Sequence, residues 1–246
     1  MNIVVVGGGA GGLPLVTKLG KRLGKRGLAN ITLVDASASH IWKPRFHEVA
    51  TGAIDSDLDA VDYRAHAHQN FYNFSKGRMS GLDRDKKEII LEPATGSGGK
   101  EILPERRIPY DYLVITVGSL GNDFNTEGVR DHCLFLDTRE QADRFHERFL
   151  NHCLSADFYR DTVSVAIVGG GATGVELAAE IHHAIALLKL YGHKELDRSR
   201  LQVHVIEAGP RLLPALSEQI ASAAQTELEN MGVKVHTGTM VKQADE

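Results

Sequence analysis

The stretch IVVVGGGAGG occupies residues 3–12, and the related stretch VSVAIVGGGATG occupies residues 163–174. Each begins with an apolar run typical of a buried parallel strand and continues into closely spaced glycines. Helical patterns follow both turns, over Leu13–Leu23 and Val175–Leu190. Because strand, glycine turn and helix occur twice in this order, the sequence predicts two copies of one α/β unit.

An acidic residue closes the second strand of each copy. The strand expected at Ile31–Val34 runs into Asp35, and the strand expected at Leu201–Ile206 runs into Glu207. In a Rossmann unit a carboxylate at this place hydrogen-bonds the adenosine ribose, while the pyrophosphate lies on the glycine turn at the helix N-terminus. The pattern therefore predicts two dinucleotide sites.

The GxGxxG spacing assigns a role to each glycine: the first permits a tight turn, the second admits the pyrophosphate, and the third lets helix and strand pack closely. The residues expected to contact the first dinucleotide are Gly7, Gly9, Ala10, Gly11, Gly12, Asp35 and Ala36. Those expected to contact the second are Gly169, Gly171, Ala172, Thr173, Gly174, Glu207 and Ala208.

Simpler interpretations stay open for these motifs. Glycine-rich turns also serve compactness alone, and Asp35 or Glu207 is also explained as a solvated acid at a strand end. If Glu207 binds the ribose, it favours NADH over NADPH by repelling the 2′-phosphate, although Arg211 lies close enough in sequence to soften that preference.

The remaining pattern fills out both units. Residues 78–91 predict a hairpin that turns at residues 83–86, and residues 94–100 predict a surface loop. Tyr112–Val117 predicts a buried strand, followed by a domain crossover in residues 118–128. Further elements are expected as a helix over Thr138–Leu154, a helix over Ser217–Met231 and a strand over Val233–His236.

Composition narrows the class of protein. The chain has 246 residues, 42% of them hydrophobic, and a net charge of −4, which disfavours a nucleic-acid-binding protein. Its first residues lack a basic leader, and no apolar run approaches the roughly 18 residues that a spanning helix needs. We expect a cytoplasmic protein that binds no nucleic acid.

Three segments carry a resemblance to one family. Residues 40–52 (HIWKPRFHEVATG), 169–178 (GGGATGVELA) and 207–214 (EAGPRLLP) are similar to segments of type II NADH:quinone oxidoreductases, flavoproteins with two dinucleotide-binding domains. The resemblance extends over essentially all of the chain, and the first segment is the most family-specific.

This resemblance implies an α/β fold of two Rossmann-like dinucleotide-binding units, the second inserted in the first and here incomplete. Residues 1–119 would form the FAD-binding domain and residues 120–246 the NAD(H)-binding domain. The implied reaction passes a hydride from NADH to FAD and then electrons to a membrane quinone. The chain is expected to be the N-terminal part of a peripheral protein of the inner face of the plasma membrane, docked through an absent C-terminal region, with a homodimer as a possible assembly.

The resemblance also assigns roles to single residues. It places Lys43 beside the flavin ring, where a cation stabilises developing negative charge; the alternative is a surface lysine packed on Trp42. It makes Glu176 a carboxylate that contacts NADH and assists proton or quinone handling, whereas the plainer interpretation is an acid in the first helical turn that complements the helix dipole. Thr116 and Gly118 would complete the FAD site, although the family usually has Ala-Thr-Gly where this chain has Thr-Val-Gly at residues 116–118.

Two other functions fit the same sequence features. The first is an NADH-dependent reductase of another acceptor, such as a redox protein, and the second is a non-catalytic NADH/FAD-binding module. Cys133 and Cys153 do not have the spacing of the dithiol motifs found in related reductases. The histidine pairs at 66/68 and 182/183 stand outside any Cys/His framework, so no metal site is expected.

Overall fold

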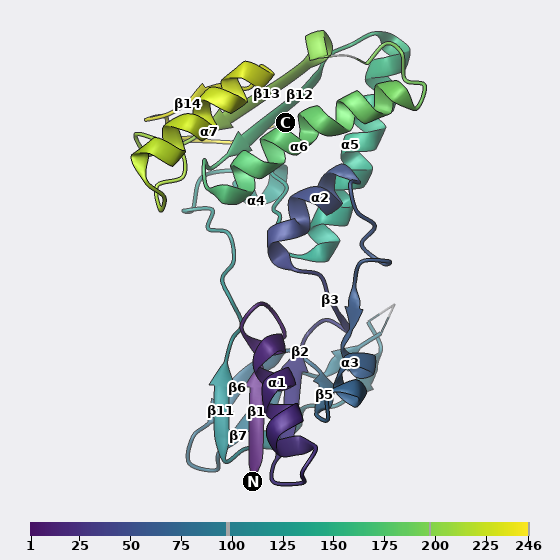
Figure 1. Cartoon of the computed structure of the whole chain (residues 1–246), viewed down its shortest axis with the longest axis vertical. Helices are drawn as coiled ribbons and strands as arrows, with labels where there is room; N and C mark the ends of the chain where they lie inside the picture. The colour runs from purple at the N-terminus through teal and green to yellow at the C-terminus, as the bar shows by residue number, and fades with distance from the viewer. Residues whose placement is uncertain (97–98, 197, 246) are drawn as a thin grey trace. The chain divides into compact units, whose positions relative to one another are not determined.

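The computed structural model describes residues 1–96, 99–196 and 198–245 and divides the chain into two compact units (Figure 1). The first unit consists of Met1–Lys43 and Asp59–Ser119. The second consists of Pro44–Leu58 and Leu120–Glu246. The chain therefore leaves the first unit twice, after Lys43 and after Ser119.

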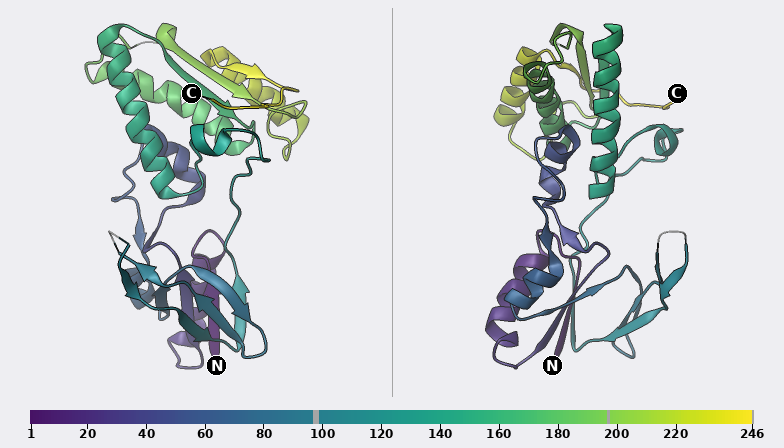
Figure 2. Two further views of the ribbon diagram at one scale, coloured as in Figure 1. Left: turned by 180° about the vertical axis from the view of Figure 1, so that it is seen from behind. Right: turned by 90° about the vertical axis from the view of Figure 1, so that its right-hand side faces the viewer.

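A parallel sheet of four strands organises the first unit, in the order β11-β1-β2-β5. Its strands are β1 (Asn2–Val6), β2 (Asn30–Asp35), β5 (Asn73–Lys76) and β11 (Tyr112–Ile115). Helices α1 (Gly12–Leu19) and α3 (Tyr63–Gln69) lie on one face of this sheet (Figure 2). An antiparallel sheet of β6 (Met79–Asp83), β7 (Glu88–Leu91) and β10 (Arg106–Pro109) lies on the other.

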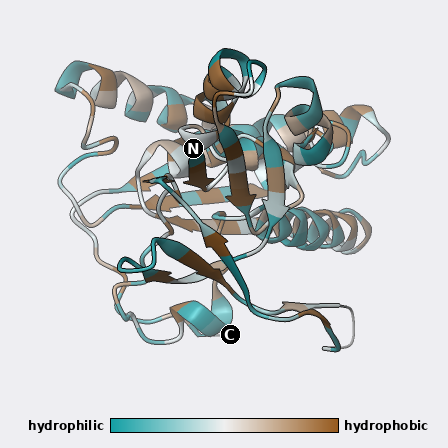
Figure 3. Ribbon diagram, turned by 90° about the horizontal axis from the view of Figure 1, so that it is seen from below, coloured by the Kyte–Doolittle hydropathy of each residue, from teal (hydrophilic) through white to brown (hydrophobic). Residues whose placement is uncertain are grey.

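Strand β1 is buried on both faces, which explains its unbroken apolar run. Ile3 and Val5 pack with Val16 of α1 in one core cluster. Val4 and Val6 face the other way and pack with Ile89 and Leu91 of the second sheet in another cluster. Because successive side chains of a strand point to opposite faces, a strand covered on both sides must be apolar at every position. Figure 3 shows hydrophobic colour along the strand that follows the N-terminus.

The short elements of the first unit frame this core. The predicted hairpin is confirmed as β6 and β7, paired antiparallel across residues 84–87. Part of the loop predicted at residues 94–100 is instead a small hairpin of β8 (Ala94–Thr95) and β9 (Glu101–Leu103), while residues 97–98 lie outside the described residues. Strand β3 (Ser39–His40) pairs with β4 (Val61–Asp62), and a 3₁₀ turn, η2, spans Lys43–Arg45.

Two expectations for this unit need correction. The helix predicted over Leu13–Leu23 is α-helical only to Leu19, because a π-helical segment, η1 (Gly20–Gly24), follows. A Cβ atom at Gly20 would lie 2.0 Å from the Asn70 carbonyl oxygen, so this close backbone approach requires glycine. Strand β11 is shorter than predicted and is not buried: it is an edge strand of the described sheet, with Tyr112 62% and Ile115 53% exposed.

The second unit repeats the architecture. Its parallel sheet has the order β12-β13-β14, and α6 packs against β12, β13 and α7. The elements are α4 (Val129–His132), α5 (Arg139–Tyr159), β12 (Val163–Val168), α6 (Ala172–Leu190), η3 (Arg198–Arg200), β13 (Leu201–Ile206), α7 (Glu218–Met231) and β14 (Lys234–His236). The helices predicted over Thr138–Leu154, Val175–Leu190 and Ser217–Met231 are confirmed, with α5 extending five residues further.

One helix of the second unit comes from the first half of the chain. Residues 44–58 lie inside the range 1–119 predicted as one domain, yet their helix α2 (Phe46–Thr51) packs against α5 and α6. Phe46, Val49 and Ala50 are buried there. The sequence does not reveal that residues 44–58 pack in the second unit, because the partners of an apolar helix face are set by tertiary packing.

The first turn of α5 is fixed by a capping box. The Thr138 hydroxyl accepts a hydrogen bond from Gln141 N (3.3 Å), and Gln141 Oε1 accepts bonds from the backbone N–H groups of Thr138 (3.1 Å) and Asp137 (2.7 Å). Such reciprocal bonds satisfy N–H groups that a helix leaves without an internal partner.

We expect Thr138→Ala to lower the free energy of unfolding by about 1 kcal/mol, because it removes the acceptor of the capping bond. Thr138→Ser keeps the hydroxyl and should retain most of the stability. Urea unfolding with an unchanged m-value measures the effect. Equal midpoints for Thr138→Ala and the unsubstituted protein would show that the box does not stabilise α5.

Candidate functional site

The glycine turn of the first unit is fixed from within the chain. Gly7 has φ +98°, a conformation that favours glycine, and its N–H donates to the Val34 carbonyl (2.8 Å). A Cβ atom at Gly12 would lie 1.8 Å from the Gly7 carbonyl oxygen. Gly7 and Gly12 therefore close the turn between β1 and α1, as the motif predicts for its first and third glycines.

The turn of the second unit has the same construction. Gly169 has φ +113° and donates to the Ile206 carbonyl (2.8 Å), and a Cβ atom at Gly174 would lie 2.1 Å from the Gly169 carbonyl oxygen. The same contacts therefore close the glycine turn in both units, which explains why the first and third glycines occur in both copies of the motif.

The second glycine of each motif is different. A Cβ atom at Gly9 or at Gly171 would meet no heavy atom within 4 Å, and neither residue has a positive φ. Among the described atoms nothing requires glycine at these two positions, although glycine costs more backbone entropy than alanine. The open space lets another molecule approach the backbone, which is the role the motif assigns to this glycine.

The helices that start at the two turns lack side-chain caps. Asp62, Thr138 and Ser217 cap α3, α5 and α7 through their side-chain oxygens. Helices α1 and α6 have the N-cap residues Gly11 and Gly171, with no side-chain capping bond. Their first N–H groups, next to Ala10 and Gly11 in one turn and at Ala172 and Thr173 in the other, are suited to a phosphate.

The acid at the end of the second strand in each unit accepts a hydrogen bond from the glycine turn of that unit. Asp35 Oδ2 accepts a bond from Gly8 N (2.7 Å), and Asp35 Oδ1 accepts one from Ser37 N (2.8 Å). Glu207 Oε2 accepts a bond from Gly170 N (2.7 Å), and Glu207 Oε1 accepts one from Gly209 N (2.6 Å). Neither acid is the solvated strand end of the simpler interpretation. Each carboxylate oxygen keeps capacity for a further donor, such as a ribose hydroxyl.

Arg211 is engaged by its own loop. Its guanidinium donates to the carbonyls of Leu213 (3.1 Å) and Pro214 (3.0 Å), and Leu213 N donates to the Gly170 carbonyl (2.8 Å). The loop after Glu207 is thereby tied to the glycine turn. An arginine that keeps these bonds does not offer the same N–H groups to a 2′-phosphate.

Two residues that the sequence did not single out shape these turns. A Cβ atom at Gly8 would lie 2.3 Å from the Tyr63 hydroxyl, and one at Gly170 would lie 2.4 Å from Leu212 Cδ2. Both side chains are buried, and burial raises the pKa of Tyr63, with the nearby Asp35 charge adding to the rise. Packing thus explains the middle glycine of each GGG, a role that the motif does not supply.

The residues at the carboxyl end of β11 have structural roles. The Thr116 hydroxyl lies 2.8 Å from the Gly7 carbonyl oxygen and 3.0 Å from that of Val6, so it ties β11 to the glycine turn. Gly118 has φ +74°. Lys43 Nζ donates to the Ser119 carbonyl (2.7 Å), and both residues end segments of the first unit.

Glu176 lies one turn further along α6 than predicted. Because α6 begins at Ala172, Glu176 is in the second turn, where complementing the helix dipole has little effect. The expected place of Glu176 in the first helical turn is therefore wrong, and its observed place gives little support to a helix-dipole role. Glu176 Oε2 lies 3.4 Å from His47 Nδ1 of α2 in the same unit.

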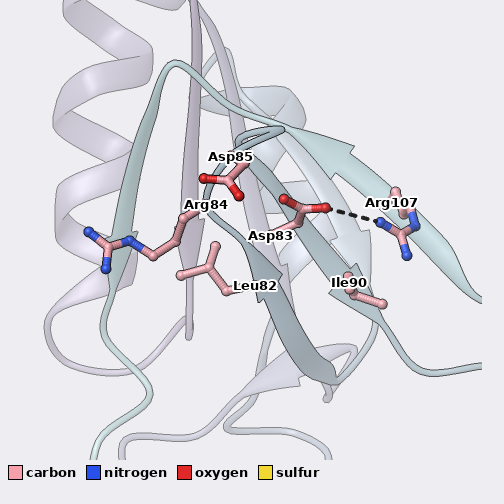
Figure 4. A pocket seen from close by; sticks show the side chains of 6 residues that line it. All are labelled: Leu82, Asp83, Arg84, Asp85, Ile90 and Arg107. Carbon is pink, nitrogen blue, oxygen red and sulfur yellow. Dashed lines mark ion pairs between the residues drawn. The ribbon is translucent and has the colours of Figure 1, made fainter.

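One hollow of the first unit is remote from the glycine turn of that unit. It is lined by Leu82, Asp83, Arg84, Asp85, Ile90 and Arg107 (Figure 4). It lies at the β6–β7 hairpin, whose Lys87 carbonyl accepts a bond from Tyr110 N, while the next residue, Asp111, bonds Asn2. These bonds place the hairpin at the amino end of β1, whereas the glycine turn follows its carboxyl end. Salt bridges of 3.5–3.8 Å from Arg107 to three acids mark it as a charged surface.

The cysteines do not form a dithiol pair. Cys153 is 1% exposed, and burial raises its pKa to about 12, which disfavours a reactive thiolate. Within the described ranges, no three His, Cys, Asp or Glu side chains gather in a way that could hold a metal ion. Among the helices that the structure describes, none combines the length and the apolar character that crossing a bilayer requires.

Comparison with known proteins agrees with this geometry. The pyridine nucleotide-disulphide oxidoreductase family matches residues 1–246, the whole chain. The chain belongs to this family.

The resemblance inferred from the three segments is confirmed by two curated relatives. The chain is 46% identical over 260 residues to the type II NADH:quinone oxidoreductase of Haemophilus influenzae, covering 99% of this chain and 59% of the relative. It is 27% identical over 250 residues to that of Staphylococcus aureus, covering 100% of this chain and 58% of the relative. The chain thus spans about three fifths of the length of these relatives.

Solved structures confirm the predicted α/β, Rossmann-like fold. NDH2 from Plasmodium falciparum in complex with NADH superposes with a TM-score of 0.81 at 22% identity, over 99% of this chain and 49% of that protein. A NAD-dependent persulfide reductase from A. fulgidus superposes with a TM-score of 0.69 at 25% identity, over 100% of this chain and 41% of that protein.

The glycines of the second turn give a matched test of the site. We expect Gly171→Ala to leave stability within about 0.5 kcal/mol, because its methyl group meets no described atom. The same methyl group should weaken NADH binding at least roughly tenfold by entering the pyrophosphate space. Gly174→Ala should instead lower stability by more than about 2 kcal/mol, since a backbone oxygen occupies its Cβ position. Fluorescence titration with NADH measures the affinity, and urea unfolding measures the stability. Unaltered NADH affinity in Gly171→Ala would refute the assignment of the second glycine turn to the pyrophosphate.

Proposed function

We propose that the protein is an FAD-dependent NADH dehydrogenase that delivers electrons to a quinone. Residues 1–119 would provide the FAD-binding domain and residues 120–246 the NAD(H)-binding domain, except that 44–58 pack in the second unit. Family membership and the names of the curated relatives support this assignment. The same names favour a quinone over another acceptor and over a non-catalytic nucleotide-binding module.

The observation that carries the proposal is the open backbone at Gly9 and Gly171. Each lies at an uncapped helix N-terminus, and each turn is braced by a carboxylate from the next strand. One such turn binds one pyrophosphate, so two turns support two dinucleotides on one chain. Two dinucleotides on one chain, FAD and NADH, would allow a hydride to pass from one to the other.

The residues of the first unit fit FAD. The backbone N–H groups from Gly9 to Gly12 would bind its pyrophosphate, and Asp35 with Ala36 would lie at its ribose. Thr116 and Gly118 would stand beside it at the end of β11. When bound there, FAD would supply the two-electron redox chemistry that protein side chains lack.

Lys43 and Glu176 are proposed to act nearer the reacting atoms. The resemblance supports Lys43 beside the flavin, where its ammonium, held by the Ser119 carbonyl, would stabilise negative charge. For Glu176 we propose a carboxylate that handles protons during quinone reduction. Its side chain is 47% exposed, which leaves it accessible to water and substrate.

Specificity for NADH is proposed to depend on Glu207. Its carboxylate would accept hydrogen bonds from the 2′- and 3′-hydroxyls of the adenosine ribose of NADH. It would repel the 2′-phosphate that NADPH carries on the same ribose. The bonds of Arg211 to its own loop support this preference.

A quinone with a lipid tail resides in a bilayer, so we also propose that the complete protein works at the inner face of the plasma membrane as a peripheral protein. Co-sedimentation with vesicles tests this docking, and light scattering tests the homodimer.

We expect NADH to be preferred over NADPH by at least roughly 30-fold in kcat/KM, since an unfavourable charge contact costs on the order of 2 kcal/mol. Glu207→Gln should narrow the ratio by relieving the repulsion. It should also weaken NADH binding, because glutamine has one side-chain oxygen where glutamate has two, so either Gly170 N–H or Gly209 N–H loses its acceptor. Glu218→Gln, which removes a charge from the first turn of α7, is the control. Equal use of NADPH by the unsubstituted protein would exclude Glu207 as the ribose acid.

For Glu176→Gln in the complete protein, we expect turnover with quinone to fall roughly tenfold or more while the melting temperature and bound FAD are retained. Stopped-flow reduction by NADH should keep its rate, so the loss should appear in reoxidation by quinone. Glu180→Gln, which removes a carboxylate one turn further along α6, should turn over normally. Unchanged turnover of Glu176→Gln would exclude the catalytic role.

A further inference from the structure

His47 has a buried ring nitrogen beside the carboxylate of Glu176. The side chain is 14% exposed, and its Nδ1 atom is buried with no hydrogen-bond partner among the described residues. Glu176 Oε2 lies 3.4 Å from this nitrogen, just beyond good hydrogen-bonding distance. The two atoms are therefore neighbours without a formed hydrogen bond, and a bond between them requires the carboxylate to reorient.

The histidine is the fixed member of this pair. Its helix, α2, is held between α5 and α6 by the buried side chains of Phe46, Val49 and Ala50. At the end of α2, Gly52 has φ +81°, and a Cβ atom there would lie 2.4 Å from His146 Cε1. Glu176 is the adjustable member, because its long side chain is 47% exposed.

The other nearby carboxylate is already paired. Glu48, next to His47 in sequence, accepts three hydrogen-bond contacts of 2.7–3.2 Å from the Arg45 guanidinium. This pairing lowers the pKa of Glu48. Adjacent helical residues also point in different directions, so the imidazole and Glu48 do not share a face. Of these two carboxylates, Glu176 is therefore the one that His47 can serve.

We propose that His47 is a positioning residue for Glu176: its Nδ1–H donates to the carboxylate and fixes the direction in which that carboxylate points. This inference rests on the proposed catalytic role of Glu176. It adds that the role depends on a residue from the segment 44–58, contributed by the first half of the chain. It also sets the tautomer, because Nδ1 must carry the hydrogen.

Substitutions of His47 in the complete protein test whether an N–H donor is required at this position. His47→Leu removes the donor, whereas His47→Asn keeps an N–H close to the place of Nδ1. We expect His47→Leu to lower turnover with quinone roughly tenfold, with flavin reduction by NADH within about twofold of normal. His47→Asn should recover most of the turnover. In the Glu176→Gln background, His47→Leu should cause less than about a twofold further loss. His152→Leu, an exposed position on α5, is the matched control.

A second measurement does not depend on activity. In ¹⁵N NMR spectra of histidine-labelled protein, the His47 ring should show a hydrogen on Nδ1. Its Nδ1 resonance should move in Glu176→Gln and stay in place in Glu180→Gln. An Nδ1 resonance unaffected by Glu176→Gln would overturn the pairing.

The two proposals fail in different ways. A loss in His47→Leu that persists fully in the Glu176→Gln background, or that His47→Asn does not relieve, would show a packing role and overturn the positioning role. Normal turnover of Glu176→Gln would remove the catalytic role of Glu176, and with it the positioning role in catalysis, while the NMR shift would still establish the pair.

Discussion

The hydrogen bond from a glycine-turn amide to a strand-end carboxylate is the contact on which both halves of this structure depend. It joins Gly8 to Asp35 in one unit and Gly170 to Glu207 in the other, at 2.7 Å in each. Each bond fixes the turn against the neighbouring strand. The open backbone at Gly9 or Gly171 and the first N–H groups of the following helix then border the same candidate phosphate site. A charged acceptor strengthens such a bond, and partial burial shields it from water.

The two copies share this contact and differ in what packs behind it. In the first unit, Tyr63 lies under Gly8, and Thr116 ties the turn to β11. In the second, Leu212 takes the place under Gly170, on a loop that Arg211 holds closed. The same ligand-binding device is thus supported by different side chains. This is the expected outcome when backbone geometry, rather than side-chain identity, defines the site.

Residues 40–52 show how a continuous motif can serve two units. His40 and Lys43 belong to the first unit, where burial lowers the pKa of His40 in spite of the nearby Asp35 charge. Helix α2 starts at Phe46 and packs in the second unit. A segment that is family-specific in sequence therefore combines one residue proposed to act on the flavin with another proposed to orient Glu176.

The sequence by itself determined the duplication, the parallel α/β class, the positions of the two glycine turns and the strands and helices that flank them. These features are local: a strand, a turn that needs Gly7 or Gly169, and a helix are encoded within about 30 residues of chain. Only the tertiary structure decided the rest. It showed that Tyr112 and Ile115 lie exposed at a sheet edge, that Glu176 faces His47 rather than the helix start, and that residues 44–58 pack in the second unit. Each of these depends on which surfaces meet across long sequence separations, and hydrophobic periodicity shows that a face is apolar without showing what covers it.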